Sequence, residues 1–195
     1  MSDANPCDEK RRRAARRQLL LIGAVAVFPF VGSYLLYQVW RPSSFVNHGE
    51  LIAAEQQAPP KAGDPMSVAL KQVSGKWVLA MIDSGACDEA CRKKLYYVRQ
   101  IRLTQGKEMD RIERMWVVTD ATSPAPTLVK EHEGTRIISA PASEWVSRLP
   151  VGAAPREYIF IIDPLGNLVL RYPNGFDPTG MKKDLSRLLR ASRIG

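Results

Sequence analysis

An uncharged apolar stretch, Gln18–Trp40, is the feature that most constrains what this chain can fold into. A helix needs about 20 apolar residues to cross the hydrocarbon core of a bilayer, and this stretch is long enough. Pro29 lies inside it, where a membrane helix tolerates a kink. Tyr34, Tyr37 and Trp40 gather at its far end, as aromatic residues do at a membrane interface. The sequence therefore predicts a single transmembrane helix over residues 18–40.

Basic residues flank this span on one side only. The run KRRRAARR, residues 10–17, directly precedes it. Because Lys and Arg concentrate on the cytoplasmic side of membrane helices, residues 1–17 are predicted to be a cytoplasmic tail. Everything after Trp40 is then on the outer face, which for a bacterial inner membrane is the periplasm. The net charge of +8 could indicate a nucleic-acid partner, but beside an apolar span the basic run is better explained as a topology signal. We therefore expect no nucleic-acid partner.

A cleaved signal peptide is the alternative for the same segment. The tripeptide VGS, Val31–Ser33, resembles a small-residue cleavage site. The apolar run nevertheless continues through Val39, beyond the roughly 7–15 residues of a signal h-region. Its length therefore favours an uncleaved anchor.

The rest of the chain divides into a tether and a folded domain. Residues 41–66 contain RPSS and QQAPPKAGDP and few large apolar residues, which is typical of a linker, with helical turns expected over Glu50–Gln57. Residues 67–195 alternate between short apolar runs and amphipathic segments. The predicted strands cover residues 76–83, 114–120, 135–140, 156–163 and 167–173, and the predicted helices cover 91–105, 123–134, 143–149 and 177–193.

The order of these elements predicts the fold class. The last two strands are joined by DPLGN, which has the composition of a turn, so they are predicted to form a hairpin. Strand–helix–strand crossovers followed by a hairpin and a terminal helix are the thioredoxin-like order. We therefore expect an α/β, thioredoxin-like domain, with a central mixed sheet flanked by helices, behind one N-terminal transmembrane helix.

The chain has three cysteines, and the predicted topology separates them. Cys7 falls in the cytoplasmic tail, where we expect a free thiol with no role. Cys87 and Cys91 follow the first domain strand on the outer side, where disulfides form and persist. Their spacing is about one helical turn, which lets the two sulfurs bridge or share one soft ion. The candidate ion is copper(I), because thiolates prefer it.

The local charges at this pair oppose one another. A helix beginning at the cysteines, together with Arg92, Lys93 and Lys94, would favour the thiolate form. Asp88 and Glu89 would oppose thiolate formation at Cys87.

The stretch GKWVLAMIDSGACDEACRKKL resembles the signature region of the SCO/SenC proteins, copper-handling assembly factors for cytochrome c oxidase. The resemblance extends through GKEMDRIERMWVVTD, TLVKEHEG and EYIFIIDPLGNLVLRYP, and so covers roughly Val68–Arg190. It implies a thioredoxin-like fold, an N-terminal membrane anchor and copper binding by Cys87 and Cys91.

One departure from this family concerns the third copper ligand. The family has a histidine a few residues before the YIFIIDP strand, whereas this chain reads VGAAPREYIFIIDP, with Pro155 near that position. His48 lies in the linker and His132 on a helix, where we expect an exposed side chain, and neither matches the family position. Met81, in a strand, and Asp83, a hard oxygen ligand, are weak replacements.

Pro155 has a second resemblance. Thioredoxin-like reductases carry a cis-proline just before this strand, packed against the cysteine pair, and GAAPREYIFIID is similar to that pattern. The resemblance implies that Pro155 is cis and offers its backbone to a substrate thiol.

Three functions are compatible with these residues. The first is a thiol–disulfide oxidoreductase in which Cys87, the more exposed cysteine, attacks and Cys91 resolves the mixed disulfide. Its client would be the cysteine pair of a cytochrome c oxidase subunit or another periplasmic thiol protein. The second is a copper(I) carrier that uses the same cysteines. The third is a binding module with a structural disulfide, which is less favoured because so short a loop is a poor staple.

Overall fold

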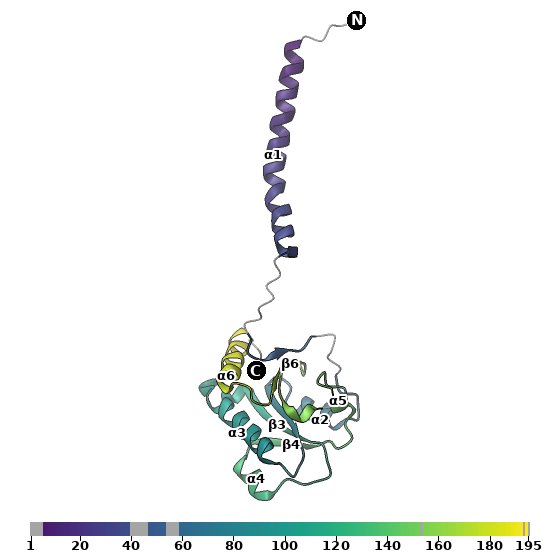
Figure 1. The fold of residues 1–195 in the computed structure, drawn as a ribbon, viewed down its shortest axis with the longest axis vertical. Helices are drawn as coiled ribbons and strands as arrows, with labels where there is room; N and C mark the ends of the chain where they lie inside the picture. Colours follow the sequence, from purple (N-terminus) through teal and green to yellow (C-terminus); the bar gives the residue numbers. More distant parts are fainter. Residues whose placement is uncertain (1–5, 40–46, 54–58, 153, 193, 195) are drawn as a thin grey trace. The chain divides into compact units, whose positions relative to one another are not determined.

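The computed structural model describes residues 6–39, 47–53, 59–152, 154–192 and 194, and it divides the chain into two units, Met1–Val46 and Asn47–Gly195. In the first unit, helix α1 (Pro6–Val39) runs through both the basic residues and the apolar stretch (Figure 1). Its segment Ala15–Gln38, with a mean hydropathy of 2.3, is long and apolar enough to cross a membrane. The predicted N-terminal apolar helix is therefore confirmed, and Trp40 lies outside the described residues.

The second unit is built on a mixed six-stranded sheet with the order β1-β6-β5-β2-β3-β4. Strands β2, β3 and β4 are parallel to one another, whereas β5, β6 and β1 join by antiparallel pairing. The strands are β1 (Glu50–Leu51), β2 (Trp77–Asp83), β3 (Ile112–Val118), β4 (Thr135–Ser139), β5 (Tyr158–Ile162) and β6 (Leu168–Pro173). The predicted thioredoxin-like class and its terminal hairpin are confirmed.

Helices cover both faces of this sheet (Figure 1). Alternate residues of β2 point to opposite sides, so Val78, Ala80 and Ile82 join one apolar cluster while Trp77 and Leu79 join another. All seven residues of β2 are buried, which explains its continuous apolar run. One face carries α2 (Pro65–Gln72) and α5 (Glu144–Ser147). The other face carries α3 (Glu89–Leu103), α4 (Pro126–Glu131) and α6 (Pro178–Ala191). Two short 3₁₀ turns, η2 (Gly106–Arg111) and η3 (Pro155–Glu157), lie in the connections that lead into β3 and β5.

Part of the predicted linker packs on the sheet. Residues Glu50 and Leu51 form β1, paired with β6, so the helical turns expected over Glu50–Gln57 are wrong at their start, and residues 54–57 lie outside the described residues. Ile52 is buried, and the backbone N–H groups of His48 and Gly49 donate to the carboxylate of Asp184 on α6. Pairing with an open sheet edge satisfies the backbone of this short segment better than an isolated helical turn would. The domain boundaries at residues 17, 40 and 66 stay predictions.

Candidate functional site

Cys87 and Cys91 form a disulfide, with their Cα atoms 5.1 Å apart. Cys87 lies in the loop that follows β2, and Cys91 lies in the first turn of α3. The cap of α3 is Asp88, whose carboxylate accepts the N–H of Cys91 at 2.9 Å. The cysteine pair therefore occupies the N-terminus of α3, as the sequence predicted.

The backbone of Cys87 has an unusual conformation. Its φ of 44° lies in the left-handed region, and within the described part of the chain the other residues with positive φ are all glycines. A non-glycine residue there costs on the order of 1–3 kcal/mol and persists only where its surroundings hold it. Such strained residues cluster at functional sites, which marks Cys87 as more than a turn residue.

Both cysteines are buried, with exposures of 2% for Cys87 and 0% for Cys91. Cys87 is the more exposed cysteine of the pair, as predicted, but the difference is small and both residues are buried. The pair belongs to an apolar cluster that draws on four elements, β2, β3, α3 and α4, and its other members are Met81, Leu95, Trp116, Val118 and Leu128. Leu128 of α4 reaches this cluster only in the tertiary structure, which the local sequence around the cysteines does not reveal.

The segment that leaves β3 is fastened to the cysteine loop by Asp120. Its carboxylate accepts the hydroxyl of Ser84 and the N–H groups of Gly85 and Thr122, the latter two at 3.0 and 3.1 Å. These hydrogen bonds, led by that from Ser84, hold the pKa of Asp120 below its ordinary value. Gly85 permits the close approach, because a Cβ there would lie 1.8 Å from the carbonyl oxygen of Thr122. The sequence analysis did not identify Asp120 or Gly85 as part of this site.

A buried ion pair lies beside the same loop. Nζ of Lys94 is 2.5 Å from Oδ2 of Asp83, and the two side chains are only 4% and 3% exposed. Nη2 of Arg156 reaches Oδ1 of Asp83 at 2.8 Å and Oδ2 of Asp88 at 3.5 Å. Burial lowers the pKa of Lys94, and the bond to Asp83 offsets part of that effect. The expected help of Lys94 to a thiolate is thus largely neutralised by Asp83.

Pro155 does not have the predicted conformation. No peptide bond in the described residues is cis, so the bond before Pro155 is trans. Pro155 begins η3, and its fixed φ suits the first position of a helical turn. With Thr119 and Ala140 it lines a cavity of about 340 Å³. A role for Pro155 in pairing with a substrate thiol stays a prediction.

The two histidines lie in different parts of the second unit, His132 at the end of α4 and His48 against Asp184 of α6. His132 is 6% exposed, so the expected surface position is wrong. It follows Leu128 by one turn on the buried side of α4, and burial lowers the pKa of its imidazole. Nδ1 of His48 is 3.2 Å from the carboxylate of Asp184, beside β6. Across the described ranges, no group of three His, Cys, Asp or Glu side chains is placed to hold a metal ion.

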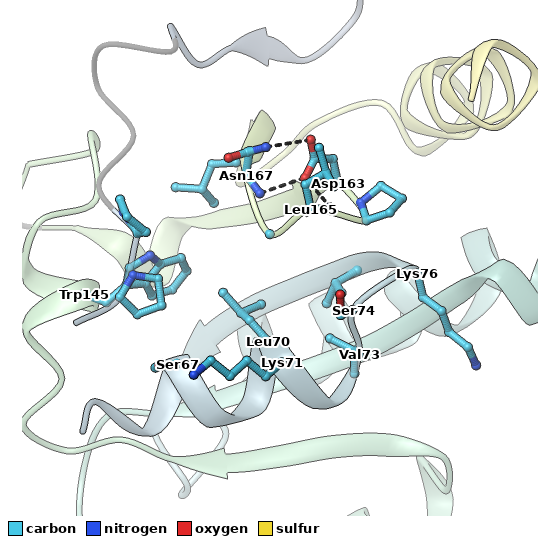
Figure 2. A pocket seen from close by; sticks show the side chains of 16 residues that line it. Ser67, Leu70, Lys71, Val73, Ser74, Lys76, Trp145, Asp163, Leu165 and Asn167 are labelled. Atoms are coloured by element: carbon cyan, nitrogen blue, oxygen red, sulfur yellow. Dashed lines mark hydrogen bonds between the residues drawn. The ribbon is translucent and has the colours of Figure 1, made fainter. Parts of the chain in front are cut away.

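A separate cavity of about 280 Å³ lies between α2 and the turn that joins β5 to β6 (Figure 2). Leu70 and Val73 of α2 line one wall, Leu165 lines the opposite wall, and Trp145 closes one end. These residues come from distant segments, which is why the sequence did not indicate a cavity. It lies on the α2 and α5 side of the sheet, opposite the disulfide cluster, and contains none of the predicted site residues.

The comparisons with known proteins agree with this architecture. The family model described as "transmembrane-like, thioredoxin-like, C-terminal domain" matches residues 77–192. No curated protein matches the chain in sequence.

Two solved structures of yeast Sco1 share the fold with a TM-score of 0.53. One contains bound copper, and both are 13% identical in sequence to this chain. Each match covers 63% of this chain, and 84% and 85% of the Sco1 chains respectively. The resemblance to SCO/SenC proteins is thus confirmed at the level of the fold. From its matched residues, we conclude that the chain belongs to the family of transmembrane-like, thioredoxin-like C-terminal domains.

Proposed function

We propose that this protein is a membrane-anchored assembly factor for cytochrome c oxidase that acts by thiol–disulfide exchange through Cys87 and Cys91. The observation that carries the proposal is the disulfide between these cysteines at the N-terminus of α3. A helix N-terminus stabilises a thiolate, which is the nucleophilic form of cysteine. The strained backbone of Cys87 also supports a functional loop rather than a simple staple.

The proposed reaction moves two electrons from the reduced protein to a client. The thiolate of Cys87 attacks a client disulfide, which forms a mixed disulfide and releases one client thiolate. Cys91 then loses its proton and attacks Cys87, which forms the intramolecular disulfide and releases the second client thiolate. A dithiol reductant on the same side of the membrane would restore the starting state. Because both cysteines are buried, the loop that carries Cys87 must become accessible for the client to react.

The client class follows from the resemblance to SCO/SenC proteins and the predicted location. We propose the cysteine pair of a cytochrome c oxidase copper site, which has to be reduced before metal enters, or another periplasmic thiol protein. The proposed location is a bacterial inner membrane, with residues 1–17 in the cytoplasm and the second unit in the periplasm. The helix that is able to span a membrane supports the anchor.

The burial of both cysteines favours a second candidate, a binding module with a structural disulfide. Enclosure in an apolar cluster protects a disulfide from exchange. The two candidates differ in redox poise, since structural disulfides have reduction potentials below about −300 mV and catalytic ones lie higher.

Equilibration of the full chain in detergent with graded dithiol/disulfide buffers tests the proposal. We expect a potential above about −300 mV. We also expect each molecule of reduced protein to reduce one disulfide, to two thiols, in an oxidised copper-site domain of the oxidase. Cys87→Ser/Cys91→Ser is the control and should be inactive. A potential below that bound, with no transfer to the client domain, would contradict exchange and leave the structural disulfide.

A further inference from the structure

Three sulfur-containing side chains lie in one buried apolar cluster. Met81 of β2 packs there with Cys87 and Cys91, at exposures of 0%, 2% and 0% respectively. Met81 lies only six residues before Cys87 in the sequence. The tertiary structure places its side chain on the α3 face of the sheet. Among the apolar residues of this cluster, the three sulfurs are the atoms that can act as soft donors.

Two alternative ligands in the described chain, Asp83 and His48, already have charged partners. Both oxygens of the Asp83 carboxylate face cations, Oδ2 towards Lys94 and Oδ1 towards Arg156. The imidazole of His48 binds Asp184 beside β6. Nδ1 of His132 is buried without a hydrogen-bond partner, but within the described residues neither histidine belongs to a group of three His, Cys, Asp or Glu side chains that could hold a metal ion. A third ligand from the described residues would therefore be of another residue type, and Met81 is the methionine that shares the cluster of the two cysteines.

The cluster also contains a hydrogen-bond donor without an acceptor. The indole Nε1 of Trp116 is buried and has no hydrogen-bond partner within the structure described. A disulfide is a weak acceptor, whereas a thiolate accepts strongly. Two thiolates and one neutral thioether around a monovalent cation would carry one negative charge. The Trp116 donor and the N-terminus of α3 both suit that charge.

We propose that Met81, Cys87 and Cys91 form a three-sulfur site for copper(I), in which the Met81 thioether supplies the third ligand that no histidine supplies. Thiolate and thioether sulfur select copper(I) over hard cations. A dithiol donor must first reduce the disulfide, transferring two electrons and two protons and becoming a disulfide itself. Copper(I) then displaces two thiol protons without changing its oxidation state. The site requires the reduced pair but no client protein.

The test is a titration of the reduced full chain in detergent with copper(I), in competition with bicinchoninate. Met81→Leu removes the thioether at nearly constant volume, the kind of substitution that protein cores tolerate best. Met115→Leu is the matched control, since Met115 is equally buried in β3 but belongs to the cluster on the opposite face. We expect Met81→Leu to weaken copper(I) binding at least ~10-fold, because even outer-shell partners of a metal are worth 10–100-fold. The control should bind as the wild type does.

X-ray absorption at the copper edge gives an independent readout that does not require a variant to fold. Three sulfur neighbours are expected in the wild type and in Met115→Leu, and two in Met81→Leu. Two sulfur neighbours in the wild type, or equal affinities of the two variants, would overturn the proposal. Wild-type binding no tighter than that of Cys87→Ser/Cys91→Ser would also overturn it. That result would leave thiol exchange standing, because exchange is measured without copper.

Discussion

At the scale of single residues, two acidic side chains near the cysteines in sequence have different interactions in the structure. Asp83 neutralises Lys94 in the interior, whereas Asp88 caps α3 directly at Cys91. Both are acids within a few residues of the pair, yet one is 3% exposed and the other 62%. Their substitution should therefore change different properties.

Asp83→Asn is expected to lower the free energy of unfolding by about 3 kcal/mol, because it leaves the buried ammonium of Lys94 without a counter-charge. Chemical denaturation of the full chain in detergent measures the change. Glu144→Gln breaks the Lys61–Glu144 pair, which is as close at 2.6 Å but lies on the surface. That control should change stability by no more than about 1 kcal/mol. Similar losses in both variants would refute a special role for the buried pair.

Asp88→Asn and Asp88→Ala separate capping from charge. Asparagine caps a helix as well as aspartate does, so Asp88→Asn should keep stability, whereas Asp88→Ala should lose about 1 kcal/mol. Both remove a negative charge beside the forming thiolates, which stabilises the reduced protein. We expect the reduction potential of the disulfide to rise by about 10–20 mV in both, from ~0.5–1 kcal/mol of electrostatic energy. An unchanged potential would show that Asp88 does not influence the thiolates.

At the scale of elements, the edge strand β1 and helix α6 are joined by a buried carboxylate. Asp184 accepts the N–H groups of His48 and Gly49 at 2.7 and 3.0 Å, and the hydroxyl of Tyr172 at 2.8 Å. Burial alone would raise the pKa of Asp184. Its hydrogen bonds to Gly49, His48 and Tyr172 together hold that pKa below the ordinary value of 3.8. The folded state therefore favours the charged form of the Asp184 carboxylate.

Acid unfolding can test the direction of this pKa shift at Asp184. Because the folded pKa is lowered, the contribution of Asp184 is fully present above its ordinary value of 3.8 and is lost as pH falls through the folded pKa. Asp184→Asn should lower stability at pH 7 by about 1–3 kcal/mol and reduce the loss of stability below about pH 4. Asp110→Asn, at a side chain 85% exposed, should leave both unchanged. An unaltered acid slope in Asp184→Asn would contradict the assignment.

At the scale of the whole molecule, the chain joins a helix that is able to span a membrane to a domain that carries a buried disulfide. Cys7 lies in the N-terminal basic tail and is the one cysteine outside the Cys87–Cys91 pair, so its labelling can report on which side of the membrane the tail lies.

We expect Cys7 in intact spheroplasts to resist a membrane-impermeant maleimide and to react once the membrane is opened. Cys87 and Cys91 should contribute no background, because a disulfide does not react. A cysteine introduced at the exposed Lys107 should react in intact spheroplasts and serves as the outer-face control. Labelling of Cys7 without opening the membrane would reverse the proposed orientation.

Elements whose causes are local could be predicted from the sequence alone. The apolar stretch predicted α1, the continuous run before Cys87 predicted β2, and the serine cap at Ser143 predicted α5. Their spacing along the chain was enough to indicate a mixed sheet with a terminal hairpin. Each of these features depends on neighbouring residues or on a period of two or 3.6, which a sequence displays directly.

Burial, strand pairing and the surroundings of the cysteines could not be predicted, because they depend on tertiary contacts. Leu128 and His132 are buried because α4 packs over a distant strand, and residues near Glu50 form a strand because β6 offers an open edge. Met81 joins the two cysteines for the same reason, since the pleat of β2 turns it towards α3. These features depend on contacts between segments far apart along the chain, and such contacts exist only once the chain has folded.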